Sequence, residues 1–262
     1  MAESKPPIVS MRGIQKAYGG VQALKGVDLD LYLGEVHALV GDNAAGKSTL
    51  IKSLAGAVRP DAGSIRFDGR EVHIDGPRDA KALGIETVYQ DLALADNLDV
   101  PANVFLGREL TRFGWFLDKR AMEERARELL SRLKINIPNI RQKVRGMSGG
   151  QRQSIAIARC VCFNARVVIL DEPTAALGVQ ETGKVYALIR EMREQGHAVL
   201  LISHNLNHVF ENCDRITVLK TGTLVGSRRV EETSQDEVVK MIVSGSAEPS
   251  AAPARERALQ AG

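Results

Sequence analysis

The sequence predicts an α/β fold: a mostly parallel sheet with flanking helices, preceded by an N-terminal antiparallel β layer and interrupted by an inserted α-helical subdomain. Three observations predict this fold. Apolar and polar residues often alternate through residues 8–40, short apolar runs at 167–170 and 198–203 alternate with helical segments, and residues 91–145 change to helical periodicity. Strands that alternate with helices indicate parallel pairing, with the helices packed on the faces of the sheet.

The first ninety residues contain the predicted β layer and the start of the parallel sheet. Residues 27–31 read Val-Asp-Leu-Asp-Leu, the pattern of a strand with one solvated face. Residues 35–40 form an apolar run that enters a glycine-containing turn and then a helical segment at 48–57. Residues 64–68 and 71–74, joined by Gly69 and Arg70, predict a small hairpin.

The middle of the chain predicts a helical insertion over residues 91–145. Glu123 with Arg127, and Glu128 with Arg132, are spaced as i,i+4 ion pairs. Apolar residues recur there at helical spacing: Met122, Ala126, Leu129, Leu130 and Leu133. After the insertion, a strand at 167–170 leads to a helix that is expected to end at Gly196, and a second strand follows at 198–203.

These segments form one predicted domain, residues 1–245, with a core of residues 8–90 and 164–243 and a helical subdomain of about 91–163. Residues 244–262 are rich in Ala, Ser, Pro and charge and have almost no large apolar residues. Such a composition cannot bury enough surface to stay ordered, so we expect residues 246–262 to be a flexible tail.

The bulk composition excludes some classes of function. The 262 residues carry 35 basic and 32 acidic side chains, a net charge of +3, which is too balanced to indicate a nucleic-acid partner. Residues 1–7 lack the apolar stretch of a secretory signal, and the longest apolar runs are far short of the roughly 20 residues that span a bilayer. The three cysteines, Cys160, Cys162 and Cys213, lack metal-ligand spacing and are expected to be buried reduced thiols of a cytosolic protein.

The strongest motif is a phosphate loop between the apolar run at 35–40 and the helical segment at 48–57. It reads Gly41-Asp42-Asn43-Ala44-Ala45-Gly46-Lys47-Ser48, followed by Thr49. In such a loop, backbone N–H groups and the helix N-terminus hold the phosphates of ATP, the lysine reaches the β and γ oxygens, and the serine ligates Mg²⁺. The pattern would occur by chance in a chain of this length roughly one time in a hundred. An ordinary glycine-containing turn is therefore a poor explanation.

Two carboxylates, Asp171 and Glu172, follow the apolar strand at 167–170. Loops at the carboxyl ends of parallel strands gather around ligands, so both side chains are expected near the phosphate loop. Asp171 suits the Mg²⁺ shell, and Glu172 suits a general base that polarises the attacking water. The alternative, a solvated acidic pair at a strand end, does not account for the phosphate loop.

A second candidate phosphate site lies at Ser148-Gly149-Gly150-Gln151, which opens a helix containing Ile155, Ile157 and Ala158. Ser148 can cap this helix, and its free N–H groups can bind an anion. A plain capped helix is the simpler explanation, but the phosphate loop already has its own helix N-terminus. A second one therefore indicates a composite nucleotide site.

The order and spacing of these three motifs resemble those of ATPases of the ABC family, from about residue 8 to residue 245. The resemblance implies the fold of the family, a P-loop NTPase core with an antiparallel β layer and a helical signature subdomain. It also implies three further roles: adenine stacking by Tyr18, contact with Mg²⁺ and water by Gln90, and contact with the γ-phosphate by His204. Taken alone, a tyrosine, a glutamine or a histidine at such positions is usually structural.

Two positions depart from the family pattern. Ala44 stands where the family usually has glycine, and alanine tolerates positive φ poorly, so the loop is expected to have a narrower choice of backbone there. Gly178 stands where the family usually has aspartate, six residues after Glu172, in a segment that crosses the dimer interface. Communication between two sites is therefore expected to be weaker or differently arranged.

The resemblance also implies partners. In the family the signature of one cassette covers ATP on another, and since each motif occurs once here, a homodimer is the simplest arrangement. The expected location is the cytoplasmic face of the inner membrane, as a peripheral subunit bound to membrane permease subunits and served indirectly by a periplasmic sugar-binding protein. Residues 41–43, 103–109 and 203–206 resemble those in ATPases of bacterial monosaccharide importers. The single cassette is similar to the short fructose-import type, so fructose is the first expected solute, ahead of ribose and xylose.

Other classes of function stay open on the sequence alone: a soluble ABC ATPase not tied to a transporter, an importer for another small solute, a phosphate-loop kinase, and a non-hydrolysing ATP sensor. Residues 91–145 show neither sustained heptads nor a basic run, which disfavours the soluble forms. A kinase would not explain the motif at 148–151, and a sensor would not need Glu172 and His204.

Overall fold

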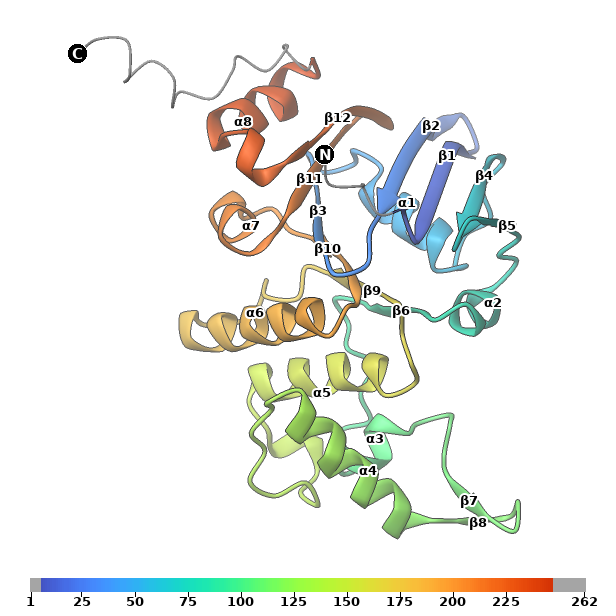
Figure 1. The fold of residues 1–262 in the computed structure, drawn as a ribbon, viewed down its shortest axis with the longest axis vertical. Coiled ribbons are helices and arrows are strands. Elements are labelled where there is room, and N and C mark those ends of the chain that lie inside the picture. Colours follow the sequence, from blue (N-terminus) through green and yellow to red (C-terminus); the bar gives the residue numbers. More distant parts are fainter. Residues whose placement is uncertain (1–5, 247–262) are drawn as a thin grey trace, which may run out of the picture.

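The computed structural model describes residues 6–246, which contain two main sheets and the helices packed against them (Figure 1). The expected tail, residues 246–262, lies outside this range except for its first residue. The strands and helices that position the site, in chain order, are β1 (Val9–Tyr18), β2 (Val21–Leu31), β3 (Val36–Val40), α1 (Lys47–Leu54), β4 (Ala62–Phe67), β5 (Arg70–Val72), α2 (Pro77–Ala82) and β6 (Ile85–Val88).

The second half of the described chain supplies the helical segment and the rest of the larger sheet. Its elements are α3 (Val100–Val104), β7 (Thr111–Arg112), β8 (Phe116–Leu117), α4 (Lys119–Arg132), η1 (Val144–Gly146), α5 (Gly149–Val161), β9 (Val167–Asp171), α6 (Val179–Glu194), β10 (Ala198–Ile202), α7 (Leu206–Asn212), β11 (Arg215–Lys220), β12 (Thr223–Arg229), η2 (Val230–Glu232) and α8 (Gln235–Ser244).

The larger sheet has six strands in the order β12-β11-β3-β10-β9-β6. All neighbouring pairs from β11 to β6 are parallel, and only the edge strand β12 is antiparallel. The predicted mostly parallel sheet is therefore confirmed. Both strands predicted from apolar runs lie at its centre, and the helix between them ends at Glu194, with Gly196 in the left-handed region as expected at a helix C-terminus.

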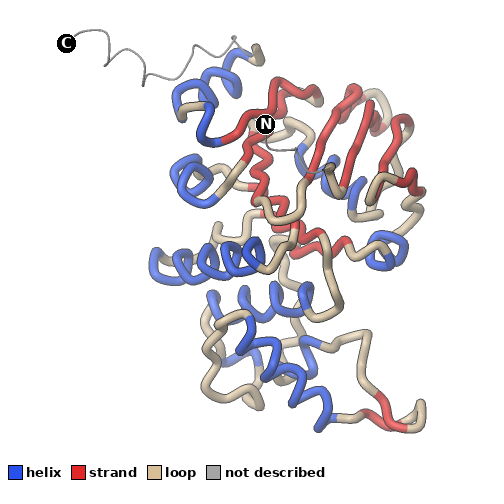
Figure 2. The backbone as a smooth tube through the Cα atoms, in the orientation of Figure 1, coloured by secondary structure: helices blue, strands red, loops and turns tan. Residues whose placement is uncertain are grey.

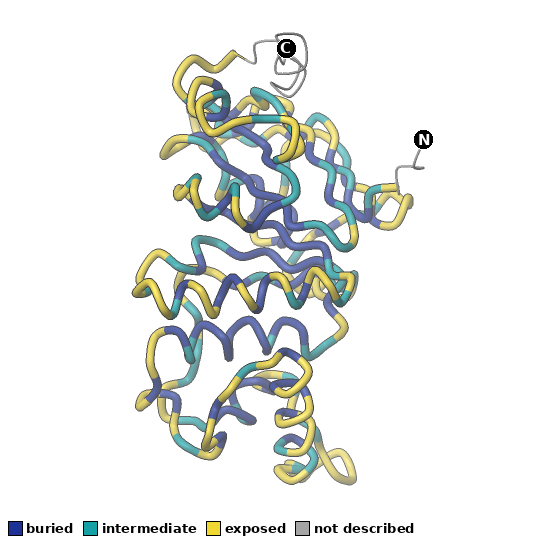
Figure 3. Tube along the Cα trace, turned by 60° about the vertical axis from the view of Figure 1, so that its left-hand side comes forward, coloured by how far each residue is buried: buried dark blue, intermediate teal, exposed yellow. Residues whose placement is uncertain are grey.

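Both faces of this sheet are buried, which explains why its strands are apolar runs without alternation. On β9, Val168 and Leu170 face the helical side of the protein, whereas Val167 and Ile169 face the antiparallel layer. Successive side chains of a strand point to opposite faces, so a strand covered on both sides must be apolar at every position. Figure 3 shows the resulting buried band through the middle of the molecule.

The predicted antiparallel layer is a four-stranded sheet in the order β2-β1-β4-β5 (Figure 2). The predicted hairpin is its β4–β5 corner, where Phe67 pairs with Arg70. Helix α1 contributes Leu50, Ile51 and Leu54 to the hydrophobic cluster that this layer shares with one face of the larger sheet. The phosphate-loop helix is thus held between two sheets.

The middle segment is mainly helical, but it also contains a hairpin, β7–β8, that helical periodicity did not predict. The hairpin projects beyond α3 and α4 (Figure 1), and its side chains, including Phe113 and Trp115, are exposed. The chain cannot continue as an α-helix here, because Phe113 and Gly114 adopt positive φ and a right-handed helix requires negative φ. The predicted helical insertion therefore also contains a short β-hairpin.

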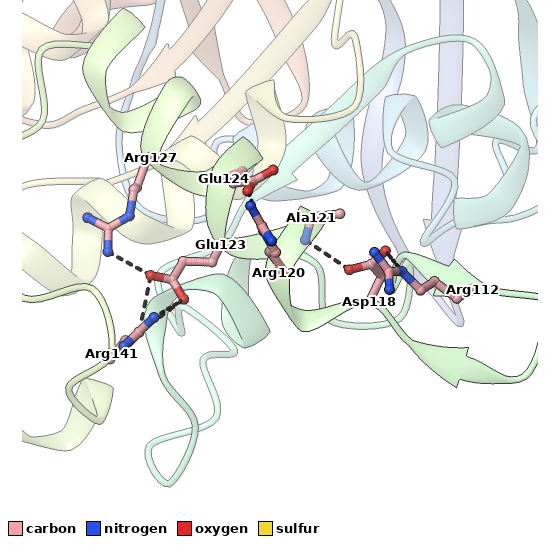
Figure 4. Close-up of polar contacts among 8 residues, drawn as sticks. All are labelled: Arg112, Asp118, Arg120, Ala121, Glu123, Glu124, Arg127 and Arg141. Atoms are coloured by element: carbon pink, nitrogen blue, oxygen red, sulfur yellow. Dashed lines mark hydrogen bonds and ion pairs between the residues drawn. The ribbon is translucent and has the colours of Figure 1, made fainter.

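Figure 4 shows how charged side chains fix the start of α4 after this hairpin. The Asp118 carboxylate accepts hydrogen bonds from the Ala121 N–H at 3.0 Å and from Arg112 Nε at 2.6 Å, so it caps the helix and closes the hairpin. The predicted pair of Glu123 and Arg127 forms at 2.6 Å, and Arg141 joins it. No ion pair links Glu128 to Arg132 within residues 6–246.

Two further sequence expectations concern thiols and membranes. Cys160 and Cys213 are free and buried, as expected, but Cys162 is only half-buried. None of the helices within residues 6–246 has the length and apolar character of a membrane span.

Candidate nucleotide-binding site

The phosphate loop connects β3 to α1, at the edge of the sheet where the parallel strands end. Gly41 and Gly46 are required sterically: a Cβ on Gly41 would lie 2.1 Å from the Leu219 carbonyl oxygen, and one on Gly46 would lie 2.7 Å from the Ala23 carbonyl oxygen. Both glycines also have positive φ, of 147° and 102°. The motif glycines therefore let the loop approach two neighbouring strands closely.

Ala44 adopts a φ of 65°, in the left-handed region. We expected the alanine to restrict the backbone of the loop, but the loop keeps the left-handed conformation and the alanine accommodates it. Such a conformation costs a non-glycine residue roughly 1–2 kcal/mol. This cost is local strain in a segment that binds ligand, a common place for it.

The Lys47 ammonium is turned back onto its own loop. Its Nζ donates hydrogen bonds to the carbonyl oxygens of Gly41, at 2.7 Å, and of Asp42, at 2.9 Å. Burial lowers the pKa of Lys47, against the opposing pull of Glu172, Asp42 and Asp171. Charged phosphate oxygens are stronger acceptors than these carbonyl oxygens, so they can replace them as hydrogen-bond partners of the ammonium.

Asp171 and Glu172 lie at the end of β9, beside the phosphate loop. Burial, and then the negative charge of Glu172, raise the pKa of Asp171, while Lys52 and Lys47 oppose this rise. Glu172 has a φ of 48°, and its N–H donates to the Ile202 carbonyl oxygen at 3.1 Å. Strained backbone conformations of this kind cluster at active sites and ligand clamps, so the φ of Glu172 points to a functional position.

His204 follows β10, the strand next to β9 in the sheet. Its Nδ1 lies 3.2 Å from Glu172 Oε2, and its side chain is 70% exposed. The two residues come together because β9 and β10 are parallel and end at the same edge. A polar cluster at that edge can act on a ligand held by the phosphate loop.

One cleft of about 520 Å³ collects most of the sequence-predicted nucleotide residues. Tyr18, at the end of β1, lines it with a half-exposed ring. The other predicted residues that line it are Asn43, Ala44, Ala45, Gly46, Lys47, Ser48, Thr49, Asp171 and Glu172. Gln90 follows β6 and is exposed, but it does not line this cleft, and neither does His204.

The predicted signature segment lies elsewhere, at the start of α5. Ser148 is the N-cap: its Oγ accepts the Gln151 N–H at 3.3 Å, and the Gln151 side chain accepts the Ser148 N–H at 3.1 Å, a capping box. Ser148, Gly150 and Gln151 line a groove between α5 and α6 that shares no residue with the nucleotide cleft. Within one chain, the phosphate loop and the signature are thus separate surfaces.

The structure adds residues that sequence reasoning missed. The turn after β11 supports the phosphate loop, because the Gly222 N–H donates to the Ala45 carbonyl at 3.0 Å, and Thr221 lines the cleft. Asn103 belongs to residues 103–109, which resemble those of monosaccharide importers. It is fully buried and forms hydrogen bonds with the backbone of Ala95 and Asp99. No local pattern signals the Gly222 contact, since it joins residues that are distant in sequence.

The phosphate loop lies between the parallel strand β3 and helix α1, and the acidic pair lies at the end of β9, which is separated from β3 by β10. This arrangement defines a nucleotide-binding domain of the phosphate-loop class. The comparison with known proteins narrows this class. A family model described as "ABC transporter" matches residues 24–175, and the chain belongs to this family of ATP-binding, ATP-hydrolysing proteins.

Two similar proteins are named as import ATP-binding proteins. The chain is 50% identical to the fructose import ATP-binding protein of Rhizobium meliloti, covering 84% of this chain and 87% of the relative. It is 46% identical to a xylose/arabinose import ATP-binding protein of Sulfolobus acidocaldarius, covering 90% and 94%. A solved ATP-binding cassette, in a dimeric post-hydrolysis state with ADP and phosphate, superposes with a TM-score of 0.71 at 25% identity, over 85% of this chain and 98% of that one.

Proposed function

We propose that this chain is the ATP-hydrolysing subunit of a bacterial sugar importer, with a monosaccharide as the solute and fructose as the first candidate. One observation carries the ATPase part: Lys47, Ser48, Asp171 and Glu172 line a single cleft, although they come from two distant segments of the chain. The relatives named above, covered nearly end to end by this chain, support the importer part.

The predicted residues in and beside the cleft each have a chemical task in this proposal. Lys47 and the loop N–H groups bind the triphosphate, Tyr18 stacks on the adenine, and Ser48, Asp171 and Gln90 hold Mg²⁺ together with phosphate oxygens and water. Glu172 accepts a proton from the water that attacks the γ-phosphorus, whose bond to the bridging oxygen breaks to leave ADP and phosphate. His204 contacts the γ-phosphate and, at 3.2 Å, orients Glu172.

The working form is a homodimer that sandwiches two ATP molecules, each held by one phosphate loop and sealed by Ser148, Gly149, Gly150 and Gln151 of the other subunit. The separation of the two surfaces within one chain supports this proposal, because one copy cannot close on itself. The dimeric solved cassette is similar in fold. Membrane permease subunits, which the dimer binds at the cytoplasmic face of the inner membrane, and a secreted sugar-binding protein complete the importer.

The dimer is tested with a variant that binds ATP without cleaving it. Glu172→Gln keeps the size of the side chain and removes the base, so ATP with Mg²⁺ is expected to convert it from monomer to dimer in light scattering. Glu172→Gln combined with Lys47→Ala is the control, and it should stay monomeric. A monomer of Glu172→Gln at saturating ATP would overturn the sandwich.

The solute is tested separately by deleting the gene and measuring uptake of labelled fructose, ribose and xylose. Wild-type protein should restore uptake of one sugar, and Glu172→Gln should not. Unchanged uptake of every sugar, with intact ATPase activity in the purified chain, would favour the alternative of a soluble ABC ATPase or an importer for another solute.

A further inference from the structure

Glu181 lies in the first turn of α6 but reaches the first turn of α5. It is the third residue of α6, after the N-cap Gly178, which has no side chain to cap the helix. A carboxylate at this position can turn back to the N-cap N–H, as in a capping box. Glu181 occupies the position of that carboxylate at the start of α6.

The same side chain packs directly on the signature turn. A Cβ on Gly150 would lie 2.9 Å from Glu181 Cβ and 3.2 Å from its Cδ, and one on Gly149 would lie 3.8 Å from Glu181 Oε2. Ser148, Gly150 and Glu181 line the same groove. The second glycine of the signature is therefore required because the Glu181 side chain occupies the space where a Cβ would be.

The carboxylate lies beside the donors of the turn, in the groove that Ser148 and Gly150 line. Hydrogen bonds from the Ser148 hydroxyl, and then from the Gly150 N–H, hold the pKa of Glu181 below its usual range, with smaller contributions from Lys184 and the Gly178 N–H. A serine hydroxyl has a single proton to donate. A Ser148 hydroxyl turned toward the Glu181 carboxylate would therefore have no proton left for a phosphate.

We propose that Glu181 is an internal anion on the signature turn, and that closure of the ATP sandwich must displace it. This inference rests on the proposed function, in which Ser148 and Gly150 seal ATP bound to the partner subunit. A negative side chain and a γ-phosphate would compete for the same two donors and would repel each other at that distance. Glu181 therefore disfavours closure and keeps the nucleotide-free subunits apart.

The test measures the ATP concentration that gives half-maximal dimer in the Glu172→Gln background, by light scattering with Mg²⁺. Adding Glu181→Gln keeps the shape and removes the charge, so about tenfold less ATP should suffice, the effect of weakening one charge-assisted hydrogen bond. Glu194→Gln, the same change at the exposed far end of α6, is the matched control and should leave the midpoint unchanged.

A merely structural role for Glu181 predicts the opposite sign, because a damaged helix start would weaken the dimer. A higher or unchanged midpoint for Glu181→Gln, with thermal unfolding like that of the parent, would overturn the inference and leave the sandwich intact. Glu181→Asp withdraws the carboxylate from the turn but keeps the charge and should shift the midpoint down by a smaller factor. Failure of Glu172→Gln itself to dimerise would instead overturn the proposed function on which this inference rests.

Discussion

Nδ1 of His204 lies 3.2 Å from Oε2 of Glu172, although 32 residues separate them in the chain. Each follows a strand of the same parallel pair, β9 and β10, and the register of that pair sets their distance. The Glu172 backbone is further tied to Ile202, two residues before His204. This arrangement fixes the glutamate in orientation before any ligand binds and underlies the first prediction.

His204→Ala should bind ATP with unchanged affinity and hydrolyse it about 100-fold more slowly, because the variant loses a positioned polar contact in the transition state and not a ground-state anchor. Fluorescent-nucleotide binding and phosphate release measure the two effects. His73→Ala removes an exposed histidine of the antiparallel layer and should change neither quantity. Equal loss of binding and turnover in His204→Ala would contradict the role given to His204.

Lys47→Ala should weaken ATP binding by about 10- to 100-fold, since charge-assisted hydrogen bonds to the triphosphate contribute roughly 1.5–3 kcal/mol. Calorimetric titration with ATP measures this loss. Lys81→Ala, which truncates an exposed lysine on α2, serves as the control. An affinity within twofold of wild type would show that the ammonium does not reach phosphate.

Ala44→Gly should stabilise the protein by about 0.5–1 kcal/mol. Relief of the left-handed conformation gains roughly 1–2 kcal/mol, and the extra freedom of glycine in the unfolded chain costs roughly 0.4–1 kcal/mol. Urea unfolding without nucleotide measures the difference. Ala23→Gly, at a strand position whose own φ is not positive, should destabilise instead.

Asp171→Asn should raise the thermal midpoint of the nucleotide-free protein by about 2 °C at pH 7.5 while abolishing Mg²⁺-dependent ATPase activity. The raised pKa of Asp171 means that the folded state holds its proton more tightly than the unfolded state does. Its contribution to the free energy of unfolding is therefore lost as the pH rises from the pKa of the unfolded state to the higher pKa of the folded state. Above that range the ionised carboxylate destabilises the folded protein. A lower midpoint for Asp171→Asn would show that the carboxylate stabilises the empty site.

His37 should make the protein sensitive to acid. It is buried on β3, its Nε2 lies 2.7 Å from Thr217 Oγ1, and burial lowers its pKa to about 3. Between about pH 6.5 and 3 the unfolded state binds a proton that the folded state does not, so stability falls on acidification, by at most about 1.4 kcal/mol per pH unit. His37→Gln should flatten this dependence between pH 7 and 5 in urea unfolding, and an unchanged slope would exclude His37 as its source.

The sequence alone determined the class of the fold and predicted the chemistry of the site. The phosphate loop, the apolar strands that are buried on both faces and the acidic pair after β9 are local patterns, and each follows from steric or solvation rules that act within a few residues. Helix caps such as Ser148 belong to this group, since the capping bonds join residues three apart.

Tertiary structure decided what depends on long-range contact. It brought His204 onto Glu172, placed the signature in a groove away from the phosphate loop, and put the Glu181 side chain where the Gly150 Cβ would be. It also placed the β7–β8 hairpin inside a helical segment. These features follow from strand register and helix packing, which join residues far apart in the chain, and no pattern within one segment encodes the distance between two others.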